Sequence, residues 1–308
     1  MRTVILQPYF GKFPEWMDLF LFSCSKNKNV DFVFFTDCKP TSIQKSYSNI
    51  KFIDISFKDY CKLVSDRLDI DFKPENTYKL CDLKPFLGIV HYDIISSYDC
   101  WGYCDIDLVF GDLTMLLDKM GEFDFISTHT DRSSGHFTLM KTKSKFTKAC
   151  FKIRNWRKKL MMQKNKCLDE NDLTIVVEMF MFYRDRFYDR FIKRCKFTLL
   201  KKVFCKSTDF IHSLVRNKKV SFEEYYTTPV PNNSSKYIFD TQAGKVFDTI
   251  KNRELPYLHF LFFKKTQYLD IKDYWKNGFY HLQQGESFSN YKCIEINKKG
   301  IFGIVSYQ

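Results

Sequence analysis

The sequence predicts an α/β protein with an open, Rossmann-like sheet flanked by helices, and three observations predict it. The segment 30–37 is an almost continuous apolar run with a polar end, as suits a strand buried on both faces of a parallel sheet. Strand, helix, strand, connection and strand patterns follow one another up to Ile55, the rhythm of a doubly wound sheet. With 308 residues, 44% of them hydrophobic, the chain can bury a substantial core.

The elements follow in order along the chain. The expected strands are 3–7, 30–37, 50–55, 100–104, 123–127 and 137–140, and short apolar patterns compatible with strands lie at 173–183 and 237–240. The expected helices are 14–24, 56–68, 78–90, 111–120 and 145–162. Pro85 is expected to break or kink the helix that contains it. We expect one domain over 1–308, in which about 141–235 forms a basic helical insertion on the acceptor side.

Composition excludes several classes of protein. The chain has no run of 18 apolar residues and no signal-peptide pattern after Met1, so we expect a cytoplasmic protein. Its 11 cysteines are scattered and include no matched pair of Cys-x-x-Cys motifs. We therefore expect reduced, partly buried cysteines rather than a zinc site or a disulfide framework.

The net charge of +13 is concentrated in the middle of the chain. The segment 141–166 contains many Lys and Arg and no acid, and a second basic cluster spans 184–202. Such charge attracts phosphate-bearing partners, either an anionic membrane surface or nucleic acid. A solvated basic helix face explains the pattern equally well.

The strongest chemical signal is the pair Asp105 and Asp107, directly after the apolar strand 100–104. Alternation along a strand places residues two apart on the same side, and open α/β sheets bind ligands at the carboxyl ends of their strands. Paired carboxylates repel unless a cation lies between them, and Mn²⁺ or Mg²⁺ takes oxygen ligands. A second such pair, Asp69 and Asp71, lies in a polar stretch that we interpret as a loop. We expect the metal at the first pair, the alternative being a solvated turn.

Two segments together resemble a known family. The segment 78–85, Tyr-Lys-Leu-Cys-Asp-Leu-Lys-Pro, precedes the segment 101–107, Trp-Gly-Tyr-Cys-Asp-Ile-Asp. Together they resemble the core of GT-A glycosyltransferases of the retaining families 8 and 32, closest to a branch found in bacterial surface-polysaccharide gene clusters. The resemblance extends from Ile5 to His259 and implies a GT-A fold with a central mixed sheet. In this family the Asp-x-Asp motif binds the metal that holds the donor diphosphate, so Asp105 belongs to both the metal-binding and the donor-binding sets.

The resemblance also implies a charged contact to the nucleotide from the helix before the acid pair. Lys79, Asp82 and Lys84 are the candidates, and a solvated helix face is the alternative for all three.

A second match to family 8 lies far along the chain. The segment 255–265 resembles the His-x-x-Gly-x-x-Lys segment in which His ligates the metal and Lys meets the diphosphate. His259 and Lys265 keep that spacing, whereas Phe262 stands in the Gly position. Imidazole suits Mn-type ions, and a lysine is a point charge for phosphate. A satisfied core histidine is the alternative for His259.

The ends of the first two strands suggest a nucleotide pocket. Pro8 and Tyr9 follow the first strand, and Thr36 and Asp37 end the second. An aromatic ring there could stack on uracil, and Asp37 could accept a hydrogen bond from the base or the ribose. Ordinary loop chemistry is the alternative.

Two more segments resemble the sugar and acceptor side of these enzymes. The segment 133–137 resembles the Ser-Gly segment that faces the donor sugar, and 167–172 resembles the acidic pair beside the reacting carbon. Asp169 or Glu170 would stabilise an oxocarbenium-like transition state or orient the acceptor hydroxyl. The alternative for these acids is the first turn of a helix, where the dipole favours negative charge.

These observations predict a metal-dependent hexosyltransferase that moves a sugar from a UDP-linked donor, UDP-Gal or UDP-Glc, to a glycan of capsule or lipopolysaccharide biosynthesis. The expected cofactor is Mn²⁺ or Mg²⁺. The acceptor would be a glycan or lipid-linked glycan, met at the inner face of an anionic membrane. One alternative is a nucleic-acid-binding protein, which the absence of a nucleic-acid motif disfavours. The other is a metal-dependent phosphohydrolase or nucleotidyltransferase that uses the same acid pair.

Overall fold

The fold is built on a seven-stranded mixed sheet, as the sequence predicts. The computed structural model describes the whole chain except residues 182–218, 230–234, 266–277, 283–284, 286 and 306–308. In sheet order the strands are β3 (Ile50–Asp54), β2 (Val30–Thr36), β1 (Thr3–Pro8), β4 (Cys100–Cys104), β7 (Phe137–Lys141), β6 (Phe125–Ser127) and β8 (Val220–Phe222). The first four are parallel, β7 is antiparallel to both of its neighbours, and β8 is parallel to β6.

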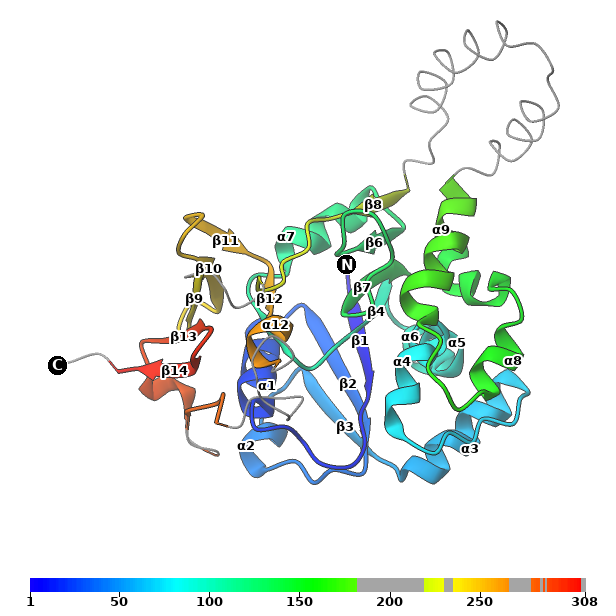
Figure 1. Cartoon of the computed structure of the whole chain (residues 1–308), viewed down its shortest axis with the longest axis horizontal. Helices are drawn as coiled ribbons and strands as arrows, with labels where there is room; N and C mark the ends of the chain where they lie inside the picture. The colour runs from blue at the N-terminus through cyan, green and yellow to red at the C-terminus, as the bar shows by residue number, and fades with distance from the viewer. Residues whose placement is uncertain (182–218, 230–234, 266–277, 283–284, 286, 306–308) are drawn as a thin grey trace, which may run out of the picture.

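Helices cover both faces of this sheet (Figure 1). One face carries α1 (Met17–Lys26), α2 (Ser42–Lys45) and α7 (Thr114–Leu117). The other carries α3 (Phe57–Leu68), α4 (Leu80–Leu83), α5 (Leu87–Val90), α6 (Tyr92–Ile95), α8 (Trp156–Met161) and α9 (Leu173–Met181). Successive residues of β1 enter opposite cores, Val4 and Leu6 one and Ile5 the other. The apolar strands are therefore buried on both faces, which explains their lack of polar alternation.

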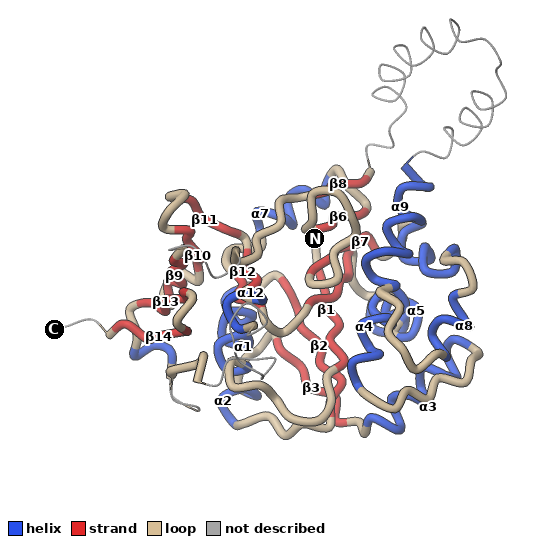
Figure 2. Tube along the Cα trace, in the orientation of Figure 1, coloured by secondary structure: helices blue, strands red, loops and turns tan. Residues whose placement is uncertain are grey.

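A second, five-stranded antiparallel sheet flanks the molecule on the side away from α8 (Figure 2). Its strands in order are β11 (Arg253–Leu255), β10 (Lys245–Asp248), β9 (Lys236–Asp240), β13 (Cys293–Asn297) and β14 (Gly300–Ile304). A third apolar cluster joins this sheet to Leu19 of α1 and to Val109 of β5 (Leu108–Phe110). Of its strands, the sequence indicates only β9.

Two secondary-structure expectations for residues 145–181 are wrong. Residues 173–181 form helix α9, not a strand, and bury Leu173, Val176 and Val177 against the α-helical core. The expected helix 145–162 is broken into the 3₁₀ helix η4 (Lys145–Lys152) and α8. The break has a backbone cause, because Ile153 is extended and Asn155 is left-handed, with φ of 56°.

The expected helix 78–90 is also divided into short turns. They are η1 (Thr77–Lys79), α4, η2 (Lys84–Phe86) and α5. Pro85 lies in the first turn of η2, where its missing N–H leaves no intrahelical bond unmade. The expected helix 111–120 is likewise divided, into α7 and the 3₁₀ helix η3 (Asp118–Gly121).

The described residues contain nine of the 11 cysteines and the helices named above. All nine cysteines in the described residues are free, and six of them are buried. Among the helices of the described ranges, none combines the length and the apolar character needed to cross a bilayer.

A buried histidine makes the fold sensitive to acid. The ring of His91 stacks on Phe35 with centroids 3.8 Å apart, and its Nε2 lies 2.9 Å from the Tyr60 hydroxyl. Burial, helped by the charge of Arg67, lowers the pKa of His91 to about 3. Its unfolded pKa is about 6.5, so below that pH the unfolded chain binds a proton that the folded chain excludes.

We expect the free energy of unfolding to fall as the pH drops from about 6.5 towards 3, with His91 contributing about 1.4 kcal/mol per pH unit. The variant His91→Gln keeps a polar partner for Tyr60 but does not titrate, so its stability should depend less on pH by that amount. Urea unfolding at several pH values between 7.5 and 4.5 measures both slopes. Equal slopes in the two proteins would show that His91 is not the acid-sensitive group.

Candidate functional site

The chain leaves the central sheet at the end of β4 and immediately presents the acid pair. The backbone N–H of Asp105 donates to the His136 carbonyl (2.8 Å), which fixes the first residue after the strand. β5 begins directly after Asp107 and pairs antiparallel with β12 (Tyr257–His259), so that Leu108 lies opposite His259. This pairing places His259 beside Asp107, although the two are 152 positions apart in the sequence.

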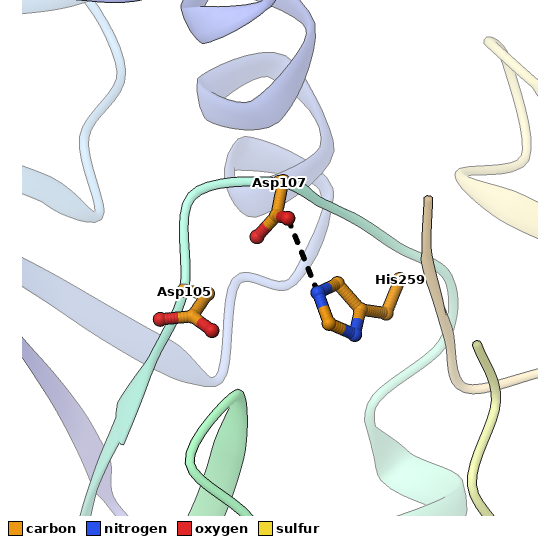
Figure 3. Close-up of side chains that lie close together, drawn as sticks. All are labelled: Asp105, Asp107 and His259. Carbon is orange, nitrogen blue, oxygen red and sulfur yellow. Dashed lines mark hydrogen bonds and ion pairs between the residues drawn. The ribbon is translucent and has the colours of Figure 1, made fainter. Parts of the chain in front are cut away.

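Asp105, Asp107 and His259 form a cluster of ligand-type side chains (Figure 3). One potential ligand atom from each lies within 4.8 Å of the other two. The His259 Nε2 is 3.1 Å from an Asp107 carboxylate oxygen, and its Nδ1 is 3.1 Å from the Thr227 hydroxyl. A partner on the second ring nitrogen is typical of histidines that bind metals, because it fixes the tautomer and the ring orientation.

Two lysines balance the charge of the acid pair. Lys264, the last residue of α12 (Leu261–Lys264), lies 2.8 Å from the Asp107 carboxylate, and Lys84 forms an ion pair with Asp105. Burial opposes the ionisation of Asp107, but Lys264 and His259 outweigh it and hold the pKa of the carboxyl well below its ordinary value. Burial likewise opposes the charge on Lys84, yet the surrounding negative groups, chiefly Asp105, hold its pKa well above the ordinary value. Asp107 and Lys84 are therefore charged at neutral pH.

The cluster opens into a cavity of about 430 Å³. The sequence-predicted residues that line it are Pro8, Tyr9, Lys84, Asp105, Asp107, Glu170, His259 and Lys265. The lining also includes residues that the sequence did not single out, among them Tyr78, Cys81, Tyr225 and Lys264. Lys264 directly precedes the lysine that the family spacing selected, and only the fold shows that it contacts Asp107.

Thr36 and Asp37 lie outside the cavity lining, and their side chains bind backbone N–H groups of nearby loops. The Thr36 hydroxyl accepts the Cys38 backbone N–H at 3.0 Å. The Asp37 carboxylate accepts the N–H of Gly11 at 2.8 Å, and Gly11 has a φ of 100°, a conformation that favours glycine. The Asp37 side chain thus holds the loop that follows Tyr9, whereas the Thr36 side chain holds the turn that follows β2.

Lys79 and Asp82 also lie outside the cavity lining, although both were candidates for a direct contact with the nucleotide. Their side chains are completely buried and form an ion pair of 2.7 Å. The third candidate of that helix, Lys84, is the one that reaches the cavity.

Asp169 and Glu170 approach the cluster from the other side. Glu170 lines the cavity, and the buried Asp169 lies 3.8 Å from the Lys84 ammonium. Burial raises the pKa of Asp169 to about 7 against the opposing charge of Lys84. Gly135 makes this approach feasible, because a Cβ there would lie 2.6 Å from an Asp169 carboxylate oxygen. The acidic pair therefore lies beside both Lys84 and the 133–137 segment.

His136 is a site residue whose role the sequence did not indicate. Its ring stacks on His259, with centroids 4.6 Å apart and planes inclined by 12°. Its nitrogens lie 2.6 Å from the Ser134 hydroxyl and 2.8 Å from the Tyr257 hydroxyl. Burial and the neighbouring His259 hold the pKa of His136 well below its ordinary value, so it supports His259 as a neutral ring.

The donor set fits a divalent cation. Two carboxylates and one imidazole are ligands that Mn²⁺ accepts, and Mg²⁺ takes the carboxylates. Three protein ligands facing a cavity leave positions for substrate oxygens. The two ammonium groups beside the carboxylates show that this position already attracts positive charge.

We expect Lys264→Met to lower the free energy of unfolding of the metal-free protein by about 1–3 kcal/mol, and with it the melting temperature. The reason is that Asp107 stays buried with one cation fewer beside it. Added Mn²⁺ should then raise the melting temperature more than it does in the wild-type protein. Lys58→Met is the control, since Lys58 is exposed and lies outside the cavity lining. A smaller Mn²⁺ effect in Lys264→Met than in wild type would contradict this assignment.

Comparison with known proteins gives one family and several structural likenesses. No curated protein matches the sequence. The fold is similar to the apo-form glycosyltransferase GlyE of Streptococcus pneumoniae TIGR4, with 13% identity and a TM-score of 0.34, over 75% of this chain and 56% of that one. It is similar to mouse xyloside xylosyltransferase 1, with 9% identity and a TM-score of 0.32, over 57% of this chain and 82% of that one. The chain thus spans 56% of the length of GlyE. Residues 5–291 match a single family model, and the protein therefore belongs to the family of unknown function DUF6625.

Proposed function

We propose that this protein is a metal-dependent glycosyltransferase that moves a hexose from a UDP-sugar to a hydroxyl group of a glycan. The observation that carries the proposal is the convergence of Asp105, Asp107 and His259 at the end of β4, facing a cavity. The sequence resemblance to GT-A enzymes of families 8 and 32 supports it, because these residues occupy the metal-binding positions of that pattern. The carboxyl edge of an open α/β sheet is also where such folds bind nucleotides.

Each side of the cavity has a role in this proposal. Asp105, Asp107 and His259 would hold Mn²⁺ or Mg²⁺, which supplies charge neutralisation to the leaving diphosphate. Lys265, which lines the same cavity, would add a second positive charge for the phosphates. Tyr9 would stack on the uracil ring.

The remaining nucleotide candidates act indirectly in this proposal. Asp37 would hold the loop that follows Pro8 and Tyr9, as its contact with the Gly11 N–H supports. Thr36 would hold the turn that carries Asp37, through its contact with the Cys38 N–H. Lys84 would orient the donor between Asp105 and the 133–137 segment, since it contacts both Asp105 and the Gly135 carbonyl.

In the proposed reaction the bond between the sugar C1 and the diphosphate oxygen breaks, and its electrons leave with UDP. The acceptor oxygen forms the new bond to C1, and its proton passes to a carboxylate or to the departing diphosphate. Glu170 lines the cavity and would orient the acceptor hydroxyl. Asp169, beside Lys84, would stabilise positive charge developing on the sugar ring. The family resemblance favours retention at C1.

We expect UDP together with Mn²⁺ to raise the melting temperature by several degrees, because a ligand at 100 times its Kd stabilises by about 2.7 kcal/mol. The variant Asp107→Asn should lose this shift. Asp71→Asn is the matched control, because Asp71 belongs to the other Asp-x-Asp pair and lies exposed beside Lys73. Hydrolysis and transfer assays with UDP-Glc and UDP-Gal then identify the donor.

Other outcomes point to the rival functions. A shift with a nucleoside triphosphate but not with UDP would favour a nucleotidyltransferase or phosphohydrolase. Binding of single-stranded oligonucleotide that weakens steeply with salt would favour a nucleic-acid-binding protein. Either result, without a UDP effect, would overturn the transferase proposal.

The surface formed by η4 and α8 would bring the enzyme to an anionic membrane that carries its acceptor. Phe151, Met161 and Met162 are exposed there, at 39%, 44% and 38%. The exposed basic side chains of the same segment are Lys143, Lys145, Lys148, Lys152, Arg154, Arg157 and Lys158. No acidic residue occurs in the sequence between Arg132 and Leu168. Basic and apolar side chains together are typical of a surface that binds anionic lipid.

We expect the protein to co-sediment with vesicles that contain phosphatidylglycerol and not with pure phosphatidylcholine vesicles. Changing Lys152, Arg157 and Lys158 to Gln should weaken this binding by about 3 kcal/mol, on the order of 100-fold. The control changes the exposed Lys45, Lys51 and Lys58 to Gln, which removes the same charge elsewhere. Equal weakening in both triple variants would show that net charge, and not this surface, binds the membrane.

A further inference from the structure

The most completely buried charges in the described residues belong to Lys79 and Asp82, which lie outside the cavity. Both side chains are 0% exposed. The Lys79 ammonium donates to Asp82 (2.7 Å) and to the carbonyls of Lys159 (2.8 Å) and Lys164 (3.0 Å). An ammonium has three N–H donors, so every one is used. Burying a charge is costly unless it is fully paired, and this pairing meets that condition.

Asp82 binds the same backbone a few residues further on. Its carboxylate accepts the N–H of Lys166 at 2.8 Å and the N–H of Leu168 at 3.0 Å. The two side chains therefore hold the backbone of residues 159–168 by two carbonyls and two amides. Between Met162 and Cys167 this segment has no helical or strand hydrogen bonding of its own. Its path is held by the buried pair and by Gln163, whose side chain accepts the Glu75 N–H at 2.9 Å and donates to the Lys73 carbonyl at 3.0 Å. Gln163 lies near the start of the segment, whereas the buried pair holds the part that leads into Leu168.

The held segment leads directly into the acidic pair of the cavity. Cys167 has a left-handed backbone with φ of 52°, and the π-helical turn η5 (Leu168–Asp172) begins at the next residue. This turn carries Asp169 and Glu170. One further anchor lies at its far end, where Lys159 pairs with Asp172 at 2.5 Å. The amide of Leu168 that Asp82 binds is adjacent to Asp169, so a shift there moves the carboxylate.

Residues 79–84 also contact the cluster of Asp105, Asp107 and His259. Lys84, two residues after Asp82, contacts Asp105 and lies 3.8 Å from Asp169. Residues 79–84 therefore contact the acidic turn in two ways. Asp82 accepts the backbone N–H of Leu168, and Lys84 lies beside the carboxylate of Asp169. Through these contacts the spacing between Asp169 and Asp105 is tied to residues 79–84.

We propose that Lys79 and Asp82 are positioning residues that hold Asp169 and Glu170 at the reacting centre, without touching the donor. This inference rests on the proposed transferase function for its catalytic consequence, and on geometry alone for the anchoring. Displacing a catalytic group by about 1 Å can cost on the order of 100-fold in rate. Removing the pair should therefore lower kcat and leave donor binding intact.

The test replaces both partners at once, because removing one would leave an uncompensated buried charge and could unfold the protein. Lys79→Met with Asp82→Leu removes the charges and all four backbone contacts. Lys79→Gln with Asp82→Asn removes the charges but keeps hydrogen-bonding groups. The control, Lys39→Met with Asp54→Asn, removes an ion pair whose side chains are 78% and 74% exposed. Each variant is measured for amide hydrogen exchange over 164–172, for the UDP and Mn²⁺ melting shift, and for kcat and KM.

The expected result is faster exchange over 164–172 in the Met/Leu variant, an unchanged UDP and Mn²⁺ shift, and a kcat lower by on the order of 100-fold. The Gln/Asn variant should recover part of both the exchange protection and the kcat. Unchanged exchange would overturn the anchoring, and faster exchange with wild-type kcat would overturn its catalytic consequence. If the wild-type protein transfers no sugar, the transferase proposal fails, and the exchange data still decide whether the pair anchors the segment.

Discussion

The candidate site depends on the three-residue pairing between β5 and β12. β5 follows the acid pair and β12 ends in His259, so their antiparallel register brings together groups from distant parts of the sequence. Gly111 continues this approach, since a Cβ there would lie 2.3 Å from the Leu255 carbonyl oxygen. The same contact attaches the five-stranded sheet to the central one, because β11 leads directly into β12. A short backbone pairing thus determines both the ligand cluster and the position of the second sheet.

Charge balance is the second constraint on the site. Two carboxylates at the end of β4 are surrounded by His259, Lys84 and Lys264, so the protein offers compensation without a bound ion. In the proposed function, a divalent cation and the donor diphosphate would enter this balance together, one positive and the other negative. A site that is already near neutrality can accept such a pair with little change in net charge. This arrangement also explains why lysines line a cavity that contains the acid pair.

Much of the central sheet could be predicted from the sequence, because its signals are local. The apolar runs of β1, β2 and β4 bury both faces and need no partner to be recognised. The five-stranded sheet has short, half-buried strands whose alternation is brief, and only β9 stood out. The apolar pattern at 173–181 fits a short buried strand as well as a buried helix, and the segment is a helix because it packs against the helical core. The basic helix 145–162 could not be divided correctly, because the left-handed backbone at Asn155 has no clear sequence signal.

The sequence by itself determined the α/β class and the candidate ligands Asp105, Asp107 and His259, since an acid pair after an apolar strand and a spaced His and Lys are patterns along the chain. Only the tertiary structure decided which charged residues of helix 78–90 face the cavity. Lys84 reaches it, whereas Lys79 and Asp82 are buried against a segment roughly eighty positions away, as their contacts with Lys159 and Lys166 show. Helical spacing alone cannot separate these cases, because the stretch is broken into short turns whose faces are set by packing. Lys264 was assigned to Asp107 for the same reason, since contact across a fold depends on where the elements pack and not on spacing in the sequence.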